Sequence, residues 1–262
     1  MERLYQKIGL NLSVSHDLQS KEIVEKFLLT INKYGDTFIP DVYGYSEPLK
    51  LKYKPNDISG PANIYMHEEI NKKLAMHGQA GGSLMMKKKS GEIFYHIEWG
   101  KSTTKPRFNY FGFSVPIRLL KRQENYIKFV AMCNEFAALF KPIQGQITNS
   151  SFPNWGEPVE LEIRLPEIRW MNYYGKPYIE MFGEEKLMRT PCYKVEKISD
   201  GLIAIQATEN LFEDIHDEVK ATIKKYLGED AFVWDNKRAL SYKDKGGRVP
   251  KFDFSGVTFK PE

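Results

Sequence analysis

Two hairpin signals constrain the fold of this chain more than any other feature of its sequence. The first is the run SLMMKKKSGEIFYHIEW, in which two apolar-rich segments flank Ser90-Gly91, a pair that accepts the positive φ of a tight turn. The second is YKVEKISDGLIAIQAT, with Asp200-Gly201 at its turn. Because strands joined by such turns run antiparallel, we expect antiparallel sheet in both parts of the chain.

Amphipathic helices and further strands are interleaved with these hairpins. Apolar residues at helical spacing predict long helices between the N-cap Ser20 and Gly35, over residues 123–140, and between Asn210 and Gly228. The last of these opens on a capping box, formed by Asn210 and Glu213. Further strands are expected at residues 3–14, 107–116 and 159–165. Hairpins alternating with helices in this way predict an α+β fold with mainly antiparallel sheets.

The length of 262 residues suits one large domain or two small ones. We expect a single α+β domain over residues 1–236, built from two similar half-units, 1–150 and 151–236, that share one core. Residues 237–262 are expected to form a tail of coil or an edge strand.

Charge is distributed unevenly along the chain. Residues 1–154 carry 21 basic and 14 acidic side chains, whereas residues 155–235 carry 10 and 17. Such a separation steers a charged partner, although two solvated faces would produce the same pattern.

Nothing in the sequence has the pattern of a membrane or export segment. The N-terminus MERLYQKIGLNLS lacks the apolar core of a secretory signal, and no stretch approaches the roughly 20 apolar residues of a membrane span. We therefore expect a soluble, cytoplasmic protein with no membrane partner. Cys133 and Cys192 suit reduced thiols in that compartment.

Local catalytic motifs are missing from the sequence. There is no nucleotide-binding loop and no hydrolase elbow. His67-Glu68-Glu69 lacks the second histidine, four residues on, that a helix-borne zinc site requires. Glu218-Val219-Lys220 has the spacing of a nuclease carboxylate and lysine, but it falls in a predicted helix, where these residues fan around the axis. We expect no enzymatic activity, no metal and no cofactor.

One alternative function rests on the run RFNYFGFSVP, residues 107–116. It is similar to the aromatic strand of RNA-recognition domains, in which alternate aromatic side chains stack on bases. Phe111 and Phe113 would share the stacking face. The same alternation also fits a half-buried strand that packs into a core.

The stretch RWMNYYGKPYIEMFG, residues 169–183, concentrates aromatic side chains among residues that bend the chain. Large aromatics enclosed in this way predict a buried hub that joins a strand to a short helix. Pro177 fits the first turn of that helix, and Gly183 would close it.

Residues 165–210 resemble a segment of bacterial immunity-protein family 52 and its relatives. Members of this family neutralise restriction-endonuclease-fold toxins in interbacterial competition, and neighbouring families linked to type VI secretion share the aromatic corner. The matching residues are Trp170, Asn172, Tyr174, Gly175, Pro177, Tyr178, Phe182, Gly183, Leu187, Pro191, Asp200, Gly201 and Gln206. The resemblance implies an immunity protein that inhibits a cognate polymorphic toxin, a nuclease, by protein–protein interaction.

A nuclease partner would have a basic cleft, which carboxylates of an inhibitor can oppose. The candidate toxin-binding carboxylates are Glu180, Glu184, Glu185, Asp200, Glu209, Glu213, Asp214 and Asp217. Tyr173 and Tyr178 are candidate aromatic anchors at the same interface. No nucleic-acid partner is expected. Two alternatives remain open at this stage: the carboxylates near residue 213 serve only the helix dipole, or the inhibitor binds the toxin away from its cleft.

Overall fold

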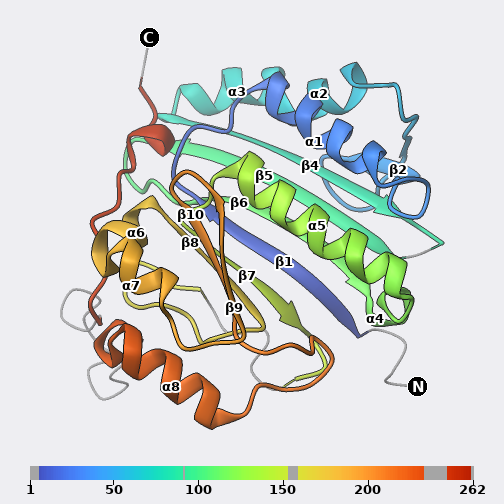
Figure 1. The fold of residues 1–262 in the computed structure, drawn as a ribbon. Helices are drawn as coiled ribbons and strands as arrows, with labels where there is room; N and C mark the ends of the chain where they lie inside the picture. Colours follow the sequence, from blue (N-terminus) through green and yellow to red (C-terminus); the bar gives the residue numbers. More distant parts are fainter. Residues whose placement is uncertain (1–5, 91, 153–158, 233–246, 261–262) are drawn as a thin grey trace. The chain divides into compact units, whose positions relative to one another are not determined.

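The structure is a computed structural model that describes residues 6–90, 92–152, 159–232 and 247–260 (Figure 1). It divides into two compact units, which are described separately below. Unit 1 comprises Met1–Pro142 and Asp253–Glu262, and unit 2 comprises Ile143–Phe252. The division therefore lies at residue 142 instead of 150, and the last ten residues belong to unit 1.

Unit 1 contains six antiparallel strands in the order β3-β2-β4-β5-β6-β1. Its strands are β1 (Lys7–Val14), β2 (Val42–Gly44), β3 (Leu51–Lys52), β4 (Gln79–Lys88), β5 (Ile93–Ser102) and β6 (Asn109–Pro116). Its helices are α1 (Lys21–Lys33), α2 (Ser59–Met66), α3 (Glu68–Ala75), α4 (Ile117–Leu120), α5 (Gln123–Phe140) and the 3-10 turn η4 (Ser255–Val257).

The first predicted hairpin is confirmed as β4 and β5. These strands pair from Gln79↔Ser102 to Lys88↔Ile93, and β6 pairs with the other edge of β5. The position of Gly91 lies outside the described residues. The N-cap prediction is also confirmed, because Ser20 accepts a hydrogen bond from the backbone N–H of Glu22 at the start of α1.

One face of the unit 1 sheet packs against α1 and α5, which lie side by side (Figure 1). Phe27 of α1 is fully buried and contacts the rings of Tyr95 on β5, Phe111 on β6 and Phe136 on α5. The contacts with Tyr95 and Phe111 are edge-to-face, a geometry that adds to the stabilisation by burial. The aromatic residues of the central strands therefore form the core.

Unit 2 contains four antiparallel strands in the order β7-β8-β10-β9. Its strands are β7 (Gln144–Asn149), β8 (Met171–Gly175), β9 (Lys194–Ser199) and β10 (Leu202–Gln206). Its helices are α6 (Lys176–Phe182), α7 (Glu184–Met188), α8 (Asp217–Leu227) and the 3-10 turn η2 (Glu229–Ala231). Both units combine antiparallel strands with packed helices, which confirms the α+β fold class.

The aromatic stretch forms the strand-to-helix junction of unit 2. Tyr174 at the end of β8 contacts Tyr178 and Phe182 of α6, and all three belong to one core cluster with residues of β10 and α8. Pro177 stands in the first turn of α6, and Gly183 ends the helix with a φ of 90°. Gly201 has a φ of 76° at the turn between β9 and β10, as that hairpin requires.

Two expected elements of unit 2 differ in the structure, and one strand was not expected. Residues 159–165 form turns instead of a strand, because the carbonyl of Glu160 accepts hydrogen bonds from the N–H groups of both Ile163 and Arg164. The strand next to β8 is β7, in a stretch whose sequence pattern did not predict one. The last helix begins at Asp217 instead of following Asn210.

The described part of the C-terminal segment contains the turn η4 and coil, and no strand. Residues 253–260 belong to unit 1, where Phe254 stacks on Phe108 and the N–H of Phe259 donates to the carbonyl of Ser102. Residues 247–252 belong to unit 2, where Arg248 pairs with Asp230 at 3.0 Å. Residues 237–246, for which coil or an edge strand was also predicted, lie outside the described residues.

Candidate functional site

The predicted carboxylates fall into two groups that differ in their neighbours. In the first group, each carboxylate lies within ion-pair distance of a basic side chain of unit 2. The pairs are Lys176–Glu180 at 3.8 Å, Lys197–Glu184 at 2.9 Å, Arg189–Glu185 at 2.9 Å and Lys197–Asp200 at 3.4 Å. Glu184 and Asp200 share Lys197, so three basic side chains offset most of the charge of these four carboxylates on the surface of α6, α7 and the β9–β10 turn.

The second group consists of Glu209, Glu213, Asp214 and Asp217, all of them exposed. Asp217, the first residue of α8, pairs with Lys220 at 3.2 Å. The other three have no Lys, Arg or His partner in the described part of the chain. Glu213 accepts a hydrogen bond from the side-chain amide of Asn210 at 2.7 Å, and Asp214 accepts from the N–H of Ile215 at 2.8 Å. These three carboxylates therefore leave an uncompensated negative charge.

Residues 209–216, hereafter the acidic loop, are fixed to the body of unit 2. The indole N–H of Trp170 and the side-chain amide of Gln206 each donate to the carbonyl of Glu209 at 3.4 Å. The side-chain amide of Asn149 donates to the carbonyl of Leu211 at 3.2 Å. Leu211 and Ile215 are buried beneath the loop. A loop held in this way loses little conformational freedom when it binds.

Two exposed aromatic side chains belong to this surface. Phe212 is 38% exposed within the acidic loop, and Tyr193, just before β9, is 53% exposed. The carboxylate of Glu209 raises the pKa of the Tyr193 hydroxyl by its charge, with smaller contributions from burial and from a hydrogen bond to the same carboxylate. Tyr193 therefore lies beside Glu209, and Phe212 belongs to the same acidic loop.

The sequence did not identify either aromatic residue as a binding residue. Phe212 falls within the helix that was expected to start after Asn210. In the structure the Asn210 side chain accepts from the N–H of Phe212 and donates to Glu213, which closes a turn and directs Phe212 outward. The sequence did contain a signal that Tyr193 is exposed. Tyr193 directly follows Pro191-Cys192, where the chain has no helix or strand.

The expectation that Tyr173 and Tyr178 anchor a partner requires a correction. Both side chains are fully buried. Tyr173 lies on β8, between β7 and β10, and Tyr178 lies on the inner side of α6, in the core cluster with Tyr174 and Phe182. Neither ring can contact a partner without disruption of the core.

The other residues of the aromatic corner also have packing or turn positions. Trp170 is 5% exposed. Asn172 is 1% exposed, and its side chain accepts from the N–H of Arg169 at 3.0 Å and donates to the carbonyl of Arg169 at 2.7 Å. Gly175 precedes α6, and Pro191 follows α7. These residues build the scaffold that carries the acidic loop.

The RNA-stacking alternative is wrong for the residues on which it rested. Phe111 and Phe113 of β6 are 0% and 2% exposed. They point toward α1 and α5, where Phe111 stacks on Phe140 and Phe113 contacts Phe129. Bases cannot reach either ring, so the alternation in this strand reflects packing into the core.

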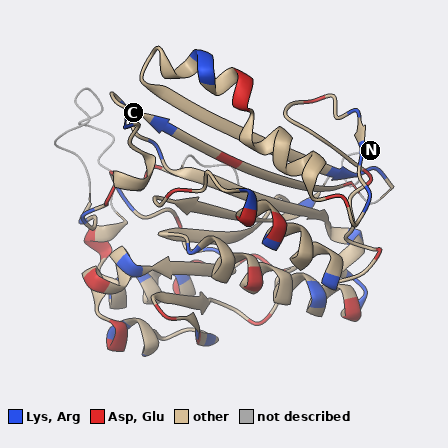
Figure 2. Ribbon diagram, turned by 90° about the horizontal axis from the view of Figure 1, so that it is seen from above, with Lys and Arg blue, Asp and Glu red and all other residues tan. Residues whose placement is uncertain are grey.

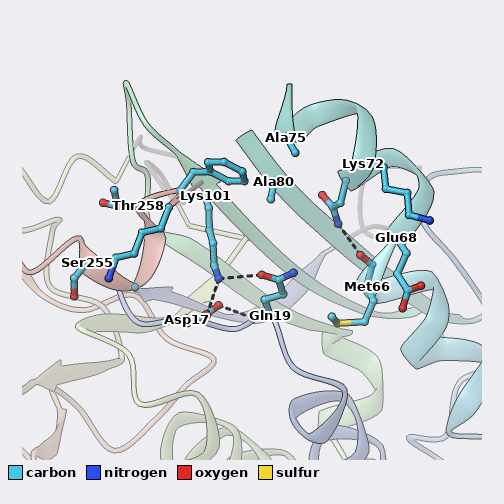
Figure 3. A pocket seen from close by; sticks show the side chains of 14 residues that line it. Asp17, Gln19, Met66, Glu68, Lys72, Ala75, Ala80, Lys101, Ser255 and Thr258 are labelled. Atoms are coloured by element: carbon cyan, nitrogen blue, oxygen red, sulfur yellow. Dashed lines mark hydrogen bonds and ion pairs between the residues drawn. The ribbon is translucent and has the colours of Figure 1, made fainter. Parts of the chain in front are cut away.

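A hollow of about 730 Å³ lies in unit 1, between α3, the ends of β4 and β5, and the C-terminal segment (Figure 3). Lys101 reaches Asp17 at 2.6 Å and Gln19 at 2.9 Å, while Glu68 and Lys72 of α3 stand on the other side. The cation of Lys101 is therefore already compensated. Both signs of charge line this hollow, which favours no single class of ligand.

A serine, a histidine and a carboxylate also meet in unit 1. Ser83 Oγ lies 3.1 Å from Nε2 of His96, and the Glu98 carboxylate lies 3.7 Å from that same nitrogen. A catalytic triad needs the carboxylate on the opposite ring nitrogen, where it orients the imidazole. This arrangement is therefore not a triad. Burial lowers the pKa of His96, despite the opposing effect of Glu98.

No group of three or more His, Cys, Asp or Glu side chains is arranged to hold a metal ion in the described ranges. Within those same ranges, no helix has the length and apolar composition needed to cross a membrane. Lys and Arg are interspersed with Asp and Glu along the helices (Figure 2), and several pair within one helix, as Glu22 does with Lys26, Glu124 with Lys128 and Glu185 with Arg189.

Comparisons with known proteins bear on the fold. No protein-family model matches the chain, and no curated protein matches it. One solved structure with a similar fold is the T6SS protein PA0821 of Pseudomonas aeruginosa, with a TM-score of 0.50 and 15% sequence identity. The match covers 85% of this chain and 72% of that one. At this identity the similarity concerns the fold alone, and membership of immunity-protein family 52 stays a prediction.

Proposed function

We propose that this protein is a cytoplasmic immunity protein of an interbacterial competition system, which neutralises a cognate toxin by binding it. The observation that carries the proposal is the acidic loop, a fixed segment that holds three uncompensated carboxylates and the exposed Phe212, with Tyr193 beside Glu209. The resemblance of residues 165–210 to immunity proteins supports it. So does the fold shared with a T6SS protein of Pseudomonas aeruginosa.

The composition of this surface suits a basic partner. Rigid aromatic side chains act as anchors in protein interfaces, and surrounding charges steer encounter and select the partner. A nuclease toxin has a basic cleft because it must hold phosphates. The acidic loop would occupy or border such a cleft, so that inhibition is steric and electrostatic and requires no turnover by this protein.

The test is co-expression with the toxin encoded next to the gene for this protein. The proposal predicts survival of the host cells and co-elution of the two purified proteins on gel filtration. Killing that continues at full strength, together with separate elution, would contradict it.

Matched charge reversals locate the interface. The triple variant Glu209→Lys, Glu213→Lys, Asp214→Lys should abolish protection. The control triple, Glu184→Lys, Glu185→Lys, Asp200→Lys, changes the net charge equally at carboxylates that already have basic partners. It should protect almost as well as the unmodified protein. Equal effects of the two triples would show that overall charge, and not the acidic loop, determines binding.

A further inference from the structure

A second hollow, of about 400 Å³, lies in unit 1 at the end of the β5–β6 hairpin. One wall is the connection between these strands, which includes Lys105, Arg107 and Phe108. The remaining wall includes Leu74 near the end of α3, Glu98 of β5 and Tyr110 of β6. All of its lining residues belong to unit 1.

Two cations at this hollow lack counter-ions. Lys105 and Arg107 are exposed, and neither forms an ion pair with any described residue. The connection that carries them is ordered by its own contacts. The hydroxyl of Ser102 accepts from the N–H groups of Thr104 and Lys105, both at 3.2 Å, and Phe108 stacks on Phe254 with ring centroids 5.0 Å apart. Both cations are therefore held at the rim by backbone of defined position.

The rest of the lining is partly apolar, and Tyr110 within it is held by a hydrogen bond. The hydroxyl of Tyr110 donates to Oδ1 of Asn11 at 2.6 Å. The ring lies over Gly112, where an added Cβ would come within 2.4 Å of the hydroxyl, so only glycine permits this position. Burial and the nearby charge of Glu98 raise the pKa of Tyr110, and its ring stays uncharged at neutral pH. With Leu74 and Phe108, it offers an apolar surface next to the cations.

We propose that this hollow binds an acidic peptide segment of a protein partner. Lys105 and Arg107 contact two carboxylates of the segment, and Leu74, Phe108 and Tyr110 contact a neighbouring apolar side chain. A peptide fits better than a nucleic acid, because a short segment can place two carboxylates on Lys105 and Arg107, whereas a continuous line of phosphates would need more than these two unpaired cations. The site belongs to unit 1 and uses none of the residues of the acidic loop, so the proposal does not depend on the proposed toxin.

The experiment uses the full-length protein and labelled ten-residue peptides. One library contains two adjacent Glu residues in every peptide, and the matched library contains Gln in their place. Fluorescence polarisation at low salt should show binding of the Glu library only, with an affinity that falls as salt is raised. Labelled single-stranded RNA is titrated in parallel.

Charge reversal assigns the binding to the hollow. The variant Lys105→Glu, Arg107→Glu should lower the affinity by about tenfold or more, as expected for the loss of two exposed charge pairs. The control Lys50→Glu, Lys52→Glu makes the same charge change at exposed positions on and beside β3. It should change the affinity for the Glu library less than about twofold. Any one of four results would overturn the proposal. These are equal binding of both libraries, no binding of the Glu library, equal losses of affinity in the two variants, or binding of RNA at the same residues that is tighter than binding of the peptides. Toxin protection is not a readout, so this result stands independently of the proposed function.

Discussion

Replacement of Asn172 by leucine tests whether the aromatic corner is a structural scaffold. The Asn172 side chain is 1% exposed on β8. It forms four hydrogen bonds, to the N–H and carbonyl of Arg169 at 3.0 and 2.7 Å, to the Gln146 amide at 3.1 Å and to the carbonyl of Ile205 at 3.4 Å. Leucine has a similar size but can form none of them.

The expected loss of stability follows from these bonds. A typical intramolecular hydrogen bond contributes about 1 kcal/mol net, and the 3.4 Å bond contributes least. We therefore expect Asn172→Leu to lower the free energy of unfolding by about 3 kcal/mol. With a urea dependence of about 2 kcal/mol/M, the unfolding midpoint falls by roughly 1.5 M.

Urea unfolding followed by far-UV circular dichroism measures this change. Asn210→Ala is the control, because it removes two hydrogen bonds of an exposed side chain and should cost less than about 1 kcal/mol. A loss below about 1 kcal/mol for Asn172→Leu would refute the view that this asparagine ties the corner together.

Three further predictions concern single positions. In a thermal unfolding assay, Gly82→Ala should destabilise unit 1 by about 3 kcal/mol, because the new Cβ would lie 1.9 Å from a backbone oxygen of α2. The control Gly100→Ala, whose new Cβ would have its nearest atom 3.9 Å away, should be nearly neutral. Equal losses of stability in the two variants would contradict this prediction. Trp170→Phe should weaken toxin binding, measured by calorimetry, because the acidic loop loses the hydrogen bond from the indole N–H to the carbonyl of Glu209. The indole itself is buried and would not contact the toxin. An unchanged affinity would show that this hydrogen bond does not preorganise the loop. Glu209→Gln should lower the pKa of Tyr193 toward its ordinary value in an NMR titration. An unaltered pKa would show that the charge of Glu209 does not act on the Tyr193 hydroxyl.

The fold was largely predictable because its signals are local. Ser90-Gly91 and Asp200-Gly201 mark the turns of the two hairpins, and Ser20 marks the start of α1. The incorrect predictions in unit 2 have two causes. Strand pairing depends on residues that are distant in the sequence, and a local turn can replace the start of a helix. Asn210 and Glu213 have the spacing of a capping box, yet their bonds close an isolated turn, and α8 starts only at Asp217.

The candidate site was only partly predictable. The sequence identified the carboxylates, including Glu209, Glu213 and Asp214, because acidic residues are dense there. It could not reveal which of them have basic neighbours, since such pairing depends on how α7 lies beside β9, as in the pair of Glu184 with Lys197. The aromatic anchors were misassigned for a related reason: burial of a tyrosine depends on tertiary packing.

The dissociation constant of the complex with the cognate toxin tests the central claim most directly. The claim is that a fixed acidic and aromatic surface on unit 2 binds the toxin. It predicts tight binding by the unmodified protein, a loss of about a hundredfold or more for Glu209→Lys, Glu213→Lys, Asp214→Lys, and a change below about tenfold for Glu184→Lys, Glu185→Lys, Asp200→Lys. An affinity that the first triple leaves unchanged, while the complex still forms, would contradict the claim.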